Sequence, residues 1–317
     1  MAKKTTFQVW AEYLPLRAIL GILSILPRRL AVRVGIFLAK LFYFITGGRK
    51  DVALKNLTIA FPEKTAAERE SLLKASFANL GRVLGEFSQF EKMTRGELDR
   101  LVEFEFENAE FKGSPEGKRI EAERENGRGM ILVGPHLGNW EIGVFAYSAA
   151  REPLTYLARP LDNPKIEELV ARLRSRFGNR SINKTNSVSA AFEVLRTGGI
   201  LGALPDVNMH PKDGIFVPFF GVEACTTRGL AMLAMRTSAM IMPMCCVWDD
   251  GKMKYVVRYG SMIEPSKTPV SDRNAEIYRL TAEMTAEMES FIRLAPDQWI
   301  WTHKRWKTRP PGEEPIY

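Results

Sequence analysis

The sequence predicts an α/β fold, in which a mostly parallel, mixed sheet is flanked by helices and preceded by N-terminal helices that anchor the chain at a membrane. Short apolar, β-rich runs alternate with helical stretches from residue 101 onward, as in layered α/β proteins. The first fifty residues are instead apolar with interspersed basic residues. The chain has 317 residues, of which 45% are hydrophobic and 26% charged. This composition is globular and excludes disordered, collagen-like and disulfide-stapled proteins.

Residues 1–48 are expected to form the membrane anchor, and residues 49–317 the α/β domain. Two apolar blocks in the first segment are separated by a Pro-Arg-Arg sequence at residues 27–29. The first block contains Glu12 and Arg17, so it falls short of the roughly 20 apolar residues of a spanning helix. Basic flanks and aromatic residues favour helices at a membrane interface. Two core helices of a soluble bundle remain the alternative.

The elements after this segment follow from hydrophobic periodicity. Residues 72–90 predict an amphipathic helix with one broad apolar face. Thr65 precedes this helix and is followed three residues later by Glu68, the pattern of a capping box. Strands are expected at residues 102–106, 130–133, 154–157, 200–204, 215–220, 239–247 and 253–259, and further helices at residues 166–176, 187–195 and 275–292.

Net charge and residue counts limit the partners and the catalytic side chains that the protein can use. The net charge of +8 favours an acidic partner, which nucleic acid, an anionic lipid surface or an acidic protein would all provide. Three cysteines without C-x-x-C spacing predict buried, reduced thiols instead of disulfides or a zinc site. The histidines are His136, His210 and His303, so a mechanism that needs a histidine must use one of these three.

The segment GMILVGPHLGNWEIG, at residues 129–143, places a histidine directly after a predicted buried strand. Sites in open α/β sheets lie where strands end, so His136 stands where catalysis is expected. Glu141 lies five residues later, about 140° around a helix axis. The two side chains therefore meet only if His136 precedes a helix that begins near Asn139, after a turn at Gly138. A carboxylate on one imidazole nitrogen would leave the other nitrogen to accept a proton from a hydroxyl, forming an acid/base dyad.

Several further segments accompany this motif in a fixed order. They read GGRKDVALKNLTIAFPE (47–63), LARPLDNP (157–164), LPDVN (204–208), GIFVPFFG (214–221) and APDQWIWTHKRWKTRP (295–310). Together with GPHLGNWE they resemble the bacterial lipid A biosynthesis acyltransferases, the late lauroyl- and myristoyl-transferase family. The resemblance covers nearly the whole chain and implies a fold like that of the glycerolipid acyltransferases.

The resemblance also implies an activity. The family transfers an acyl chain from acyl-carrier protein to a hydroxyl of a lipid A precursor or related glycolipid, at the cytoplasmic face of the inner membrane. His136 matches the family's general base, and Glu141 matches the acid that orients it. The resemblance thus implies an O-acyltransferase in which the acceptor attacks the thioester directly. Acyl-carrier protein, a glycolipid and the membrane are the expected partners, and neither a cofactor nor a metal is expected.

Two arginines and one helix start are expected to contact the substrate. Arg159 matches a family arginine at the active-site groove, where a guanidinium would bind a phosphate or the oxyanion; a surface salt bridge is the alternative. Arg174 is a second candidate, although Arg176 stands in the same LRSRF run. Backbone N–H groups near Asn139 would donate to the oxyanion.

Two other candidates follow later strands. Asp206 closes a buried strand in the family's second acidic motif, flanks the cleft and is expected to hold a loop or an arginine in place. Asn208 stands where many relatives have aspartate, which argues against a metal site there. Thr227 is expected to cap the next helix and to face the cleft. The FVPFFG run, residues 216–221, fits either an acyl-chain groove or a core strand.

The C-terminal tail carries the densest basic and aromatic cluster, over residues 299–309. No nucleic-acid motif accompanies it, so the membrane surface, glycolipid phosphates or an acidic carrier protein are the expected contacts. G-x-S-x-G, H-E-x-x-H, Walker and dinucleotide motifs are all missing from the sequence, which removes the simplest support for a serine hydrolase, zinc protease or NTPase. The alternatives to lipid A acylation are transfer to another lipid acceptor and a catalytically silent lipid-binding protein.

Overall fold

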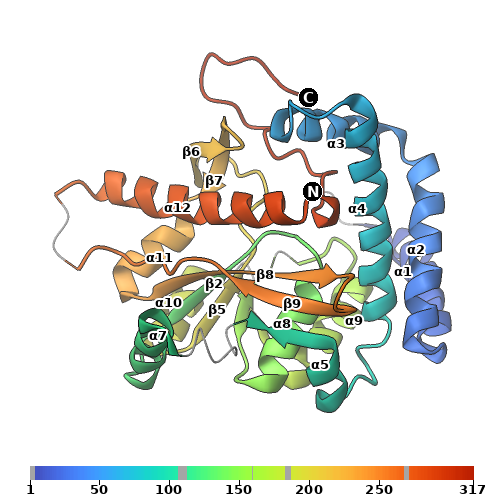
Figure 1. The fold of residues 1–317 in the computed structure, drawn as a ribbon, viewed down its shortest axis with the longest axis horizontal. Helices are drawn as coiled ribbons and strands as arrows, with labels where there is room; N and C mark the ends of the chain where they lie inside the picture. Colours follow the sequence, from blue (N-terminus) through green and yellow to red (C-terminus); the bar gives the residue numbers. More distant parts are fainter. Residues whose placement is uncertain (1–3, 106–112, 159, 183–186, 268–270) are drawn as a thin grey trace.

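The computed structural model describes residues 4–105, 113–158, 160–182, 187–267 and 271–317 (Figure 1). The strands are β1 (Val102–Phe104), β2 (Met130–Val133), β3 (Thr155–Leu157), β4 (Arg180–Ile182), β5 (Ile200–Ala203), β6 (Gly214–Phe219), β7 (Val222–Thr227), β8 (Met240–Asp249) and β9 (Lys254–Tyr259). The helices are α1 (Thr6–Ile25), α2 (Arg28–Ile45), α3 (Gly47–Ala60), α4 (Ala66–Phe87), α5 (Arg95–Leu101), α7 (Pro115–Glu125), α8 (Trp140–Ala150), α9 (Pro164–Arg174), α10 (Ser187–Arg196), α11 (Gly229–Thr237) and α12 (Arg273–Leu294).

The central sheet has the strand order β1-β9-β8-β2-β5-β3-β4. Its strand pairs are parallel except for β8 and β9, which are antiparallel. β6 and β7 form a separate antiparallel hairpin. Helices cover both faces of the sheet, with α12 lying across one face and α8 and α5 on the other (Figure 1). The predicted α/β architecture with a mostly parallel, mixed sheet is therefore confirmed.

Alternation along β2 explains why both faces of the sheet are covered. Met130 and Leu132 belong to the core shared with α8 and α9, whereas Ile131 and Val133 belong to the core shared with α10, α11 and α12. Successive side chains of a strand point to opposite faces. A strand that is apolar at every position must therefore be buried on both sides, which is typical of parallel sheets.

The N-terminal helices pack on α4 by close backbone contact. A Cβ atom on Gly81 would lie 2.4 Å from the carbonyl oxygen of Gly35, so only glycine allows α2 and α4 to approach this closely. Thr65 and Glu68 form the predicted capping box at the start of α4. Within the residues that the structure describes, no single helix is long and apolar enough to cross a membrane; α2 and α3 reach that length together but meet at a bend of 95°.

Much of α1 and α2 is apolar and exposed. The exposed fractions are 82% for Phe7, 80% for Ile25, 75% for Phe44 and 77% for Ile45. Other large apolar side chains that are exposed on these helices are Trp10, Leu14, Ile19, Ile22, Leu30, Phe37, Leu41 and Phe42. We call this set the apolar face of α1–α2. Soluble proteins rarely leave so many large apolar side chains together in water.

The C-terminal residues 295–317, which we call the C-terminal strap, cross the molecule and end beside α3 (Figure 1). Trp299, Trp301 and Trp306 are almost wholly buried in a core shared with α3, α4 and the β6–β7 hairpin. Arg305 is also fully buried. The expectation that this cluster faces a membrane or a carrier protein is therefore wrong for these four side chains, because each packs inside the protein.

Two smaller predictions are decided by burial. Val217, Phe219 and Phe220 are buried, with Phe219 against Trp299 and Trp306, whereas Pro218 is exposed. The inward-facing positions of the FVPFFG run therefore belong to the core, the second of the two expected alternatives. The three cysteines are buried and free, as predicted.

Candidate functional site

The candidate site lies where two neighbouring parallel strands end. β2 and β5 are paired in parallel, with Val133 opposite Ala203. Three residues beyond each strand stand His136 and Asp206, respectively. Because both strands run in the same direction, their carboxyl ends lie at one edge of the sheet, where ligands bind in open α/β folds. The topology thus brings together two residues that are 70 positions apart in the chain.

Asp206 holds His136 through both of its carboxylate oxygens. His136 Nδ1 lies 2.6 Å from Oδ1, and the His136 backbone N–H donates to Oδ2 over 2.7 Å. The Trp299 indole N–H also donates to Oδ2, over 2.8 Å. Because a carboxylate only accepts hydrogen bonds, the imidazole proton lies on Nδ1. Nε2 then carries the lone pair of a base, on a side chain that is 29% exposed.

The charges of this pair shift both pKa values. Burial opposes ionisation of Asp206, but His136 and the hydrogen bond from Trp299 lower the pKa of its carboxyl group to about 2. Burial also lowers the pKa of His136, yet the charge of Asp206 and its hydrogen bond outweigh this effect, and Glu141 adds to them. The net pKa of His136 is raised above its usual value of 6.5. The imidazole is therefore a stronger base than free histidine.

Glu141 lies in the first turn of α8 but pairs with a different residue. Arg174 Nε donates to Glu141 Oε2 over 2.8 Å, and a second guanidinium nitrogen contacts Oε1, so the pair is bidentate. Burial opposes the charge of Arg174, but Glu141 outweighs this effect, with help from Tyr156, and the pKa of Arg174 is raised. The sequence predicts Glu141 on the imidazole, whereas the structure places Asp206 there. The physical reason is that Asp206 arrives from the adjacent strand β5, while Arg174 at the end of α9 engages Glu141.

Asn139 shapes the start of α8. Its side-chain oxygen accepts the Ile142 backbone N–H over 3.1 Å, and its own backbone N–H donates to Cys246. Gly138 has a positive φ of 63°, and a Cβ there would lie 2.0 Å from the Cys246 carbonyl oxygen. The predicted turn and helix start are confirmed. Asn139 is fully buried, and its side chain acts as a helix cap through the bond to Ile142. The oxyanion role of the neighbouring N–H groups stays a prediction.

The remaining two candidates from the sequence are Thr227 and Arg159. The Thr227 hydroxyl accepts the Gly229 backbone N–H over 3.2 Å, but Arg228 is the N-cap of α11 and no side chain caps this helix, so the prediction that Thr227 is the cap is wrong. Thr227 also lines the cavity described next. Arg159 lies outside the described residues. Among the candidates, the structure thus brings together His136 with Asp206 and Glu141 with Arg174.

An apolar cavity of about 330 Å³ lies at the end of β5, near Asp206, although neither His136 nor Asp206 lines it. Pro205 and Val207, the two neighbours of Asp206, both line it. Its wall is mainly aliphatic and comes from the end of β5, from α10 and from α11; it includes Leu157, Ala191, Ala203, Leu230 and Leu233. We call it the aliphatic cavity. A site that combines a base with an adjacent apolar cavity is chemically suited to a substrate with a hydrocarbon chain.

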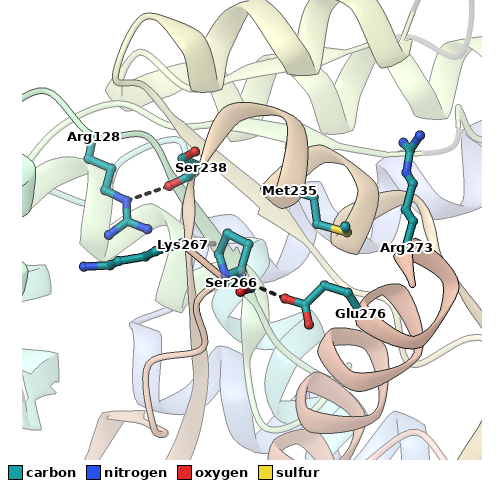
Figure 2. A pocket seen from close by; sticks show the side chains of 8 residues that line it. Arg128, Met235, Ser238, Ser266, Lys267, Arg273 and Glu276 are labelled. Carbon is teal, nitrogen blue, oxygen red and sulfur yellow. Dashed lines mark hydrogen bonds between the residues drawn. The ribbon is translucent and has the colours of Figure 1, made fainter. Parts of the chain in front are cut away.

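A second cavity, of about 280 Å³, is lined by polar groups around the start of α12 (Figure 2). It includes Arg128, which precedes β2 and therefore lies at the amino end of the strands, away from His136. Arg128 already pairs with Glu264, and Glu276 accepts the Ser266 backbone N–H. Arg273 lies on the opposite side of this cavity from Arg128 (Figure 2). These charges do not converge on one point, so the site is assigned to the His136 edge.

The C-terminal strap supplies groups that sequence reasoning missed. The Ile300 N–H donates to the His136 carbonyl, and the Gly138 N–H donates to the Gln298 carbonyl. His303 Nε2 lies 2.9 Å from the Asn208 backbone nitrogen. Asp206 could be chosen as a site candidate from the sequence because it directly follows a buried strand. No such local pattern marks the strap residues as part of the site, because their contacts depend on the path of the chain through the fold.

The fold and site define an α/β protein that holds a histidine–aspartate pair beside an aliphatic cavity. The model of the family described as "Bacterial lipid A biosynthesis acyltransferase" matches residues 3–308. The chain belongs to this family. It is 30% identical to the lipid A biosynthesis lauroyltransferase of Escherichia coli K12, over 96% of this chain and 93% of that protein.

Two other relatives in the same organism carry different names. The lipid A biosynthesis palmitoleoyltransferase is 29% identical over 85% of this chain and 82% of its own length. The lipid A biosynthesis myristoyltransferase is 24% identical over 96% of this chain and 89% of its own length. Family membership supports an acyltransferase of lipid A biosynthesis, but the three names specify three different acyl chains.

Proposed function

We propose that this protein transfers an acyl chain from acyl-carrier protein to a hydroxyl of a lipid A precursor, at the cytoplasmic face of the inner membrane. The observation that carries the proposal is the His136–Asp206 pair at the carboxyl edge of the sheet, next to the aliphatic cavity. Its chemistry fits deprotonation of a hydroxyl close to a lipid chain. Family membership supports lipid A as the acceptor class.

In the proposed reaction His136 Nε2 accepts the proton of the acceptor hydroxyl as its oxygen attacks the thioester carbonyl. A C–O bond forms, and the carbonyl oxygen takes the negative charge of a tetrahedral intermediate. The C–S bond then breaks, and the imidazolium returns the proton to the leaving thiolate. Asp206 stabilises the imidazolium and fixes its tautomer, and such acid/base catalysis contributes about 10²- to 10⁴-fold.

Glu141 keeps a role in this proposal through its charge. It lies close enough to raise the pKa of His136, and the bidentate pair with Arg174 holds it in place. Backbone N–H groups in the first turn of α8 are the proposed donors to the oxyanion, because helix N-termini stabilise negative charge. No cofactor takes part in the proposed chemistry.

The aliphatic cavity is the proposed acyl-chain site. Its wall includes Ala203 at the end of β5, so Ala203→Leu would shorten the space available. Each methylene excluded from an apolar site costs about 0.8 kcal/mol. The variant should therefore favour an acyl chain about two carbons shorter, by about tenfold.

Membrane attachment is proposed to occur through the apolar face of α1–α2. Exposed basic residues accompany this face, including Arg17, Arg33 and Lys40. An apolar surface with basic residues binds anionic bilayers in the interfacial plane. This position would place the site near a lipid acceptor without requiring a spanning helix.

The proposal is tested by lipid mass spectrometry of membranes from cells that express the wild-type protein, His136→Ala or His210→Ala. His210 is an exposed histidine outside the site and serves as the matched control. The wild type and His210→Ala should add one acyl group to lipid A, whereas His136→Ala should add none. The mass of the product identifies the chain. Equal acylation by all three proteins would contradict the assignment of His136, and wild-type acylation of a different lipid would contradict the proposed acceptor.

A further inference from the structure

His303 lies on the C-terminal strap, beside the proposed base, and has no assigned role. Two contacts place this part of the strap against the site: Trp299 donates to Asp206, and the Ile300 N–H donates to the His136 carbonyl. His303 itself is half-buried and contacts Asn208, two residues beyond Asp206. The electrostatic influence of Asp206 and His136 reaches it. A second histidine thus stands next to the His136–Asp206 pair.

The protonation state of His303 follows from one hydrogen bond. A backbone N–H is always a donor, so the Asn208 N–H, at 2.9 Å, requires a lone pair on His303 Nε2. The ring is then neutral and carries its proton on Nδ1. Burial lowers the pKa of His303, Arg305 and His136 lower it further, and Asp206 opposes them. In the described part of the chain, no hydrogen bond from Nδ1 is found.

We infer that His303 is a neutral hydrogen-bond donor that binds an oxygen of the substrate through its Nδ1–H group. The inference rests on the proposed acyl transfer at His136. A neutral donor suits this place, because it does not repel the imidazolium that forms on His136. A neutral imidazole that polarises a carbonyl is an established catalytic device. The oxygen belongs either to the thioester carbonyl or to the head group of the acceptor lipid.

Two variants separate the two nitrogens of the ring. In His303→Gln, the longer side chain places its amide oxygen near the position of Nε2, so it keeps the acceptor for Asn208 but lacks the Nδ1 donor. In His303→Asn, the shorter side chain places its amide N–H near the position of Nδ1 and loses the contact to Asn208. A residue that only held the loop would be replaced better by glutamine.

The expected result is a fall in kcat/KM of about 100-fold for His303→Gln, which is typical for loss of one donor at a reacting oxygen, and a fall of about tenfold or less for His303→Asn. A fall confined to kcat would identify the thioester carbonyl as the bound oxygen. A rise in KM for the acceptor lipid alone would identify its head group. Activity of His303→Gln equal to or above that of His303→Asn would overturn the inference. Absence of acyl transfer by the wild type would instead contradict the proposed function.

Nitrogen-15 NMR of the histidine side chains tests the protonation state without relying on turnover or on a variant of His303. The chain has only three histidines, so His136→Ala and His210→Ala assign the signals. We expect His303 to be neutral with its proton on Nδ1 at pH 7, and to remain so below pH 6.5. A charged ring at pH 7, or a proton on Nε2, would overturn the inference.

Discussion

The two ends of the chain have similar compositions, with tryptophan, other apolar residues and basic side chains, but the fold uses them in opposite ways. Trp10 on α1 is 41% exposed, whereas Trp301 and Trp306 on the C-terminal strap are fully buried. Arg33 on α2 is exposed and Arg305 on the strap is fully buried. Composition alone therefore does not separate a surface for lipid from a segment of the core.

Hydrogen bonding explains the difference. The indole N–H groups of Trp299, Trp301 and Trp306 donate to Asp206, Pro296 and Val222, respectively. Arg305 donates to the backbone carbonyls of Val207 and Cys225, and burial lowers its pKa to about 10. Polar groups can be buried when they find partners. The strap finds them across the whole fold, whereas the apolar face of α1–α2 has solvent on one side.

The largest expected effect concerns stability. Trp306→Ala would empty a fully buried site and should lower the free energy of unfolding by about 3–5 kcal/mol. Trp10→Ala removes a partly exposed ring and should change it by less than about 1 kcal/mol. Urea unfolding in detergent, followed by circular dichroism, measures both values. Equal losses in the two variants would contradict the distinction between the two ends.

Membrane binding, in contrast to stability, should depend on the exposed apolar side chains of α1–α2. Phe44→Ser combined with Ile45→Ser removes two side chains that are 75% and 77% exposed. Burial of such side chains contributes about 1.5–3 kcal/mol each, so binding to lipid vesicles should weaken by at least about a hundredfold. Leu294→Ser, on an exposed apolar residue at the end of α12, is the matched control and should bind normally. Vesicle sedimentation gives the affinities, and unchanged binding of the double variant would contradict the proposed attachment.

Removal of basic side chains from α2 should have a smaller effect on membrane binding. Arg33→Gln and Lys40→Gln remove exposed basic residues of α2, each worth about 1 kcal/mol near an anionic bilayer. Affinity for anionic vesicles should fall about fivefold per residue, and the loss should disappear in high salt. Neutral vesicles provide the control, because their binding should not change. An equal loss on neutral vesicles would show that the substitutions act on folding and not on electrostatic attraction.

Much of the fold follows from sequence patterns, since strands such as β2 and capping boxes such as that of Thr65 are local features. The position of His136 after a strand was predictable for the same reason. The partner of His136 was not, because it depends on which strand lies next to β2 in the sheet. Glu141 is near in sequence, but Asp206 reaches the imidazole from β5.

The path and burial of the C-terminal strap were still harder to predict from the sequence. Trp299 and Trp301 are separated by Ile300, and Trp301 and Trp306 by a polar and basic run, so no simple period marks the three tryptophans as core. The short strands β4 and β7 were likewise missed; β4 is only three residues long and mostly exposed. Such segments are stabilised by tertiary contacts that no local pattern encodes.

In the proposed reaction, Asp206 on Nδ1 sets the basicity of His136. The pH dependence of kcat/KM tests it most directly in the wild type, Asp206→Asn and Glu141→Gln. Because only the neutral imidazole accepts a proton, the wild-type rate should rise with pH through a pKa above 6.5.

Removal of the Asp206 charge takes away what raises this pKa, so in Asp206→Asn the rise should move to lower pH. The plateau should fall by about 10²- to 10⁴-fold. Glu141→Gln should shift the rise in the same direction by less. A rise that stays at the wild-type pH in Asp206→Asn, or that moves further in Glu141→Gln, would show that Asp206 does not set the basicity of His136.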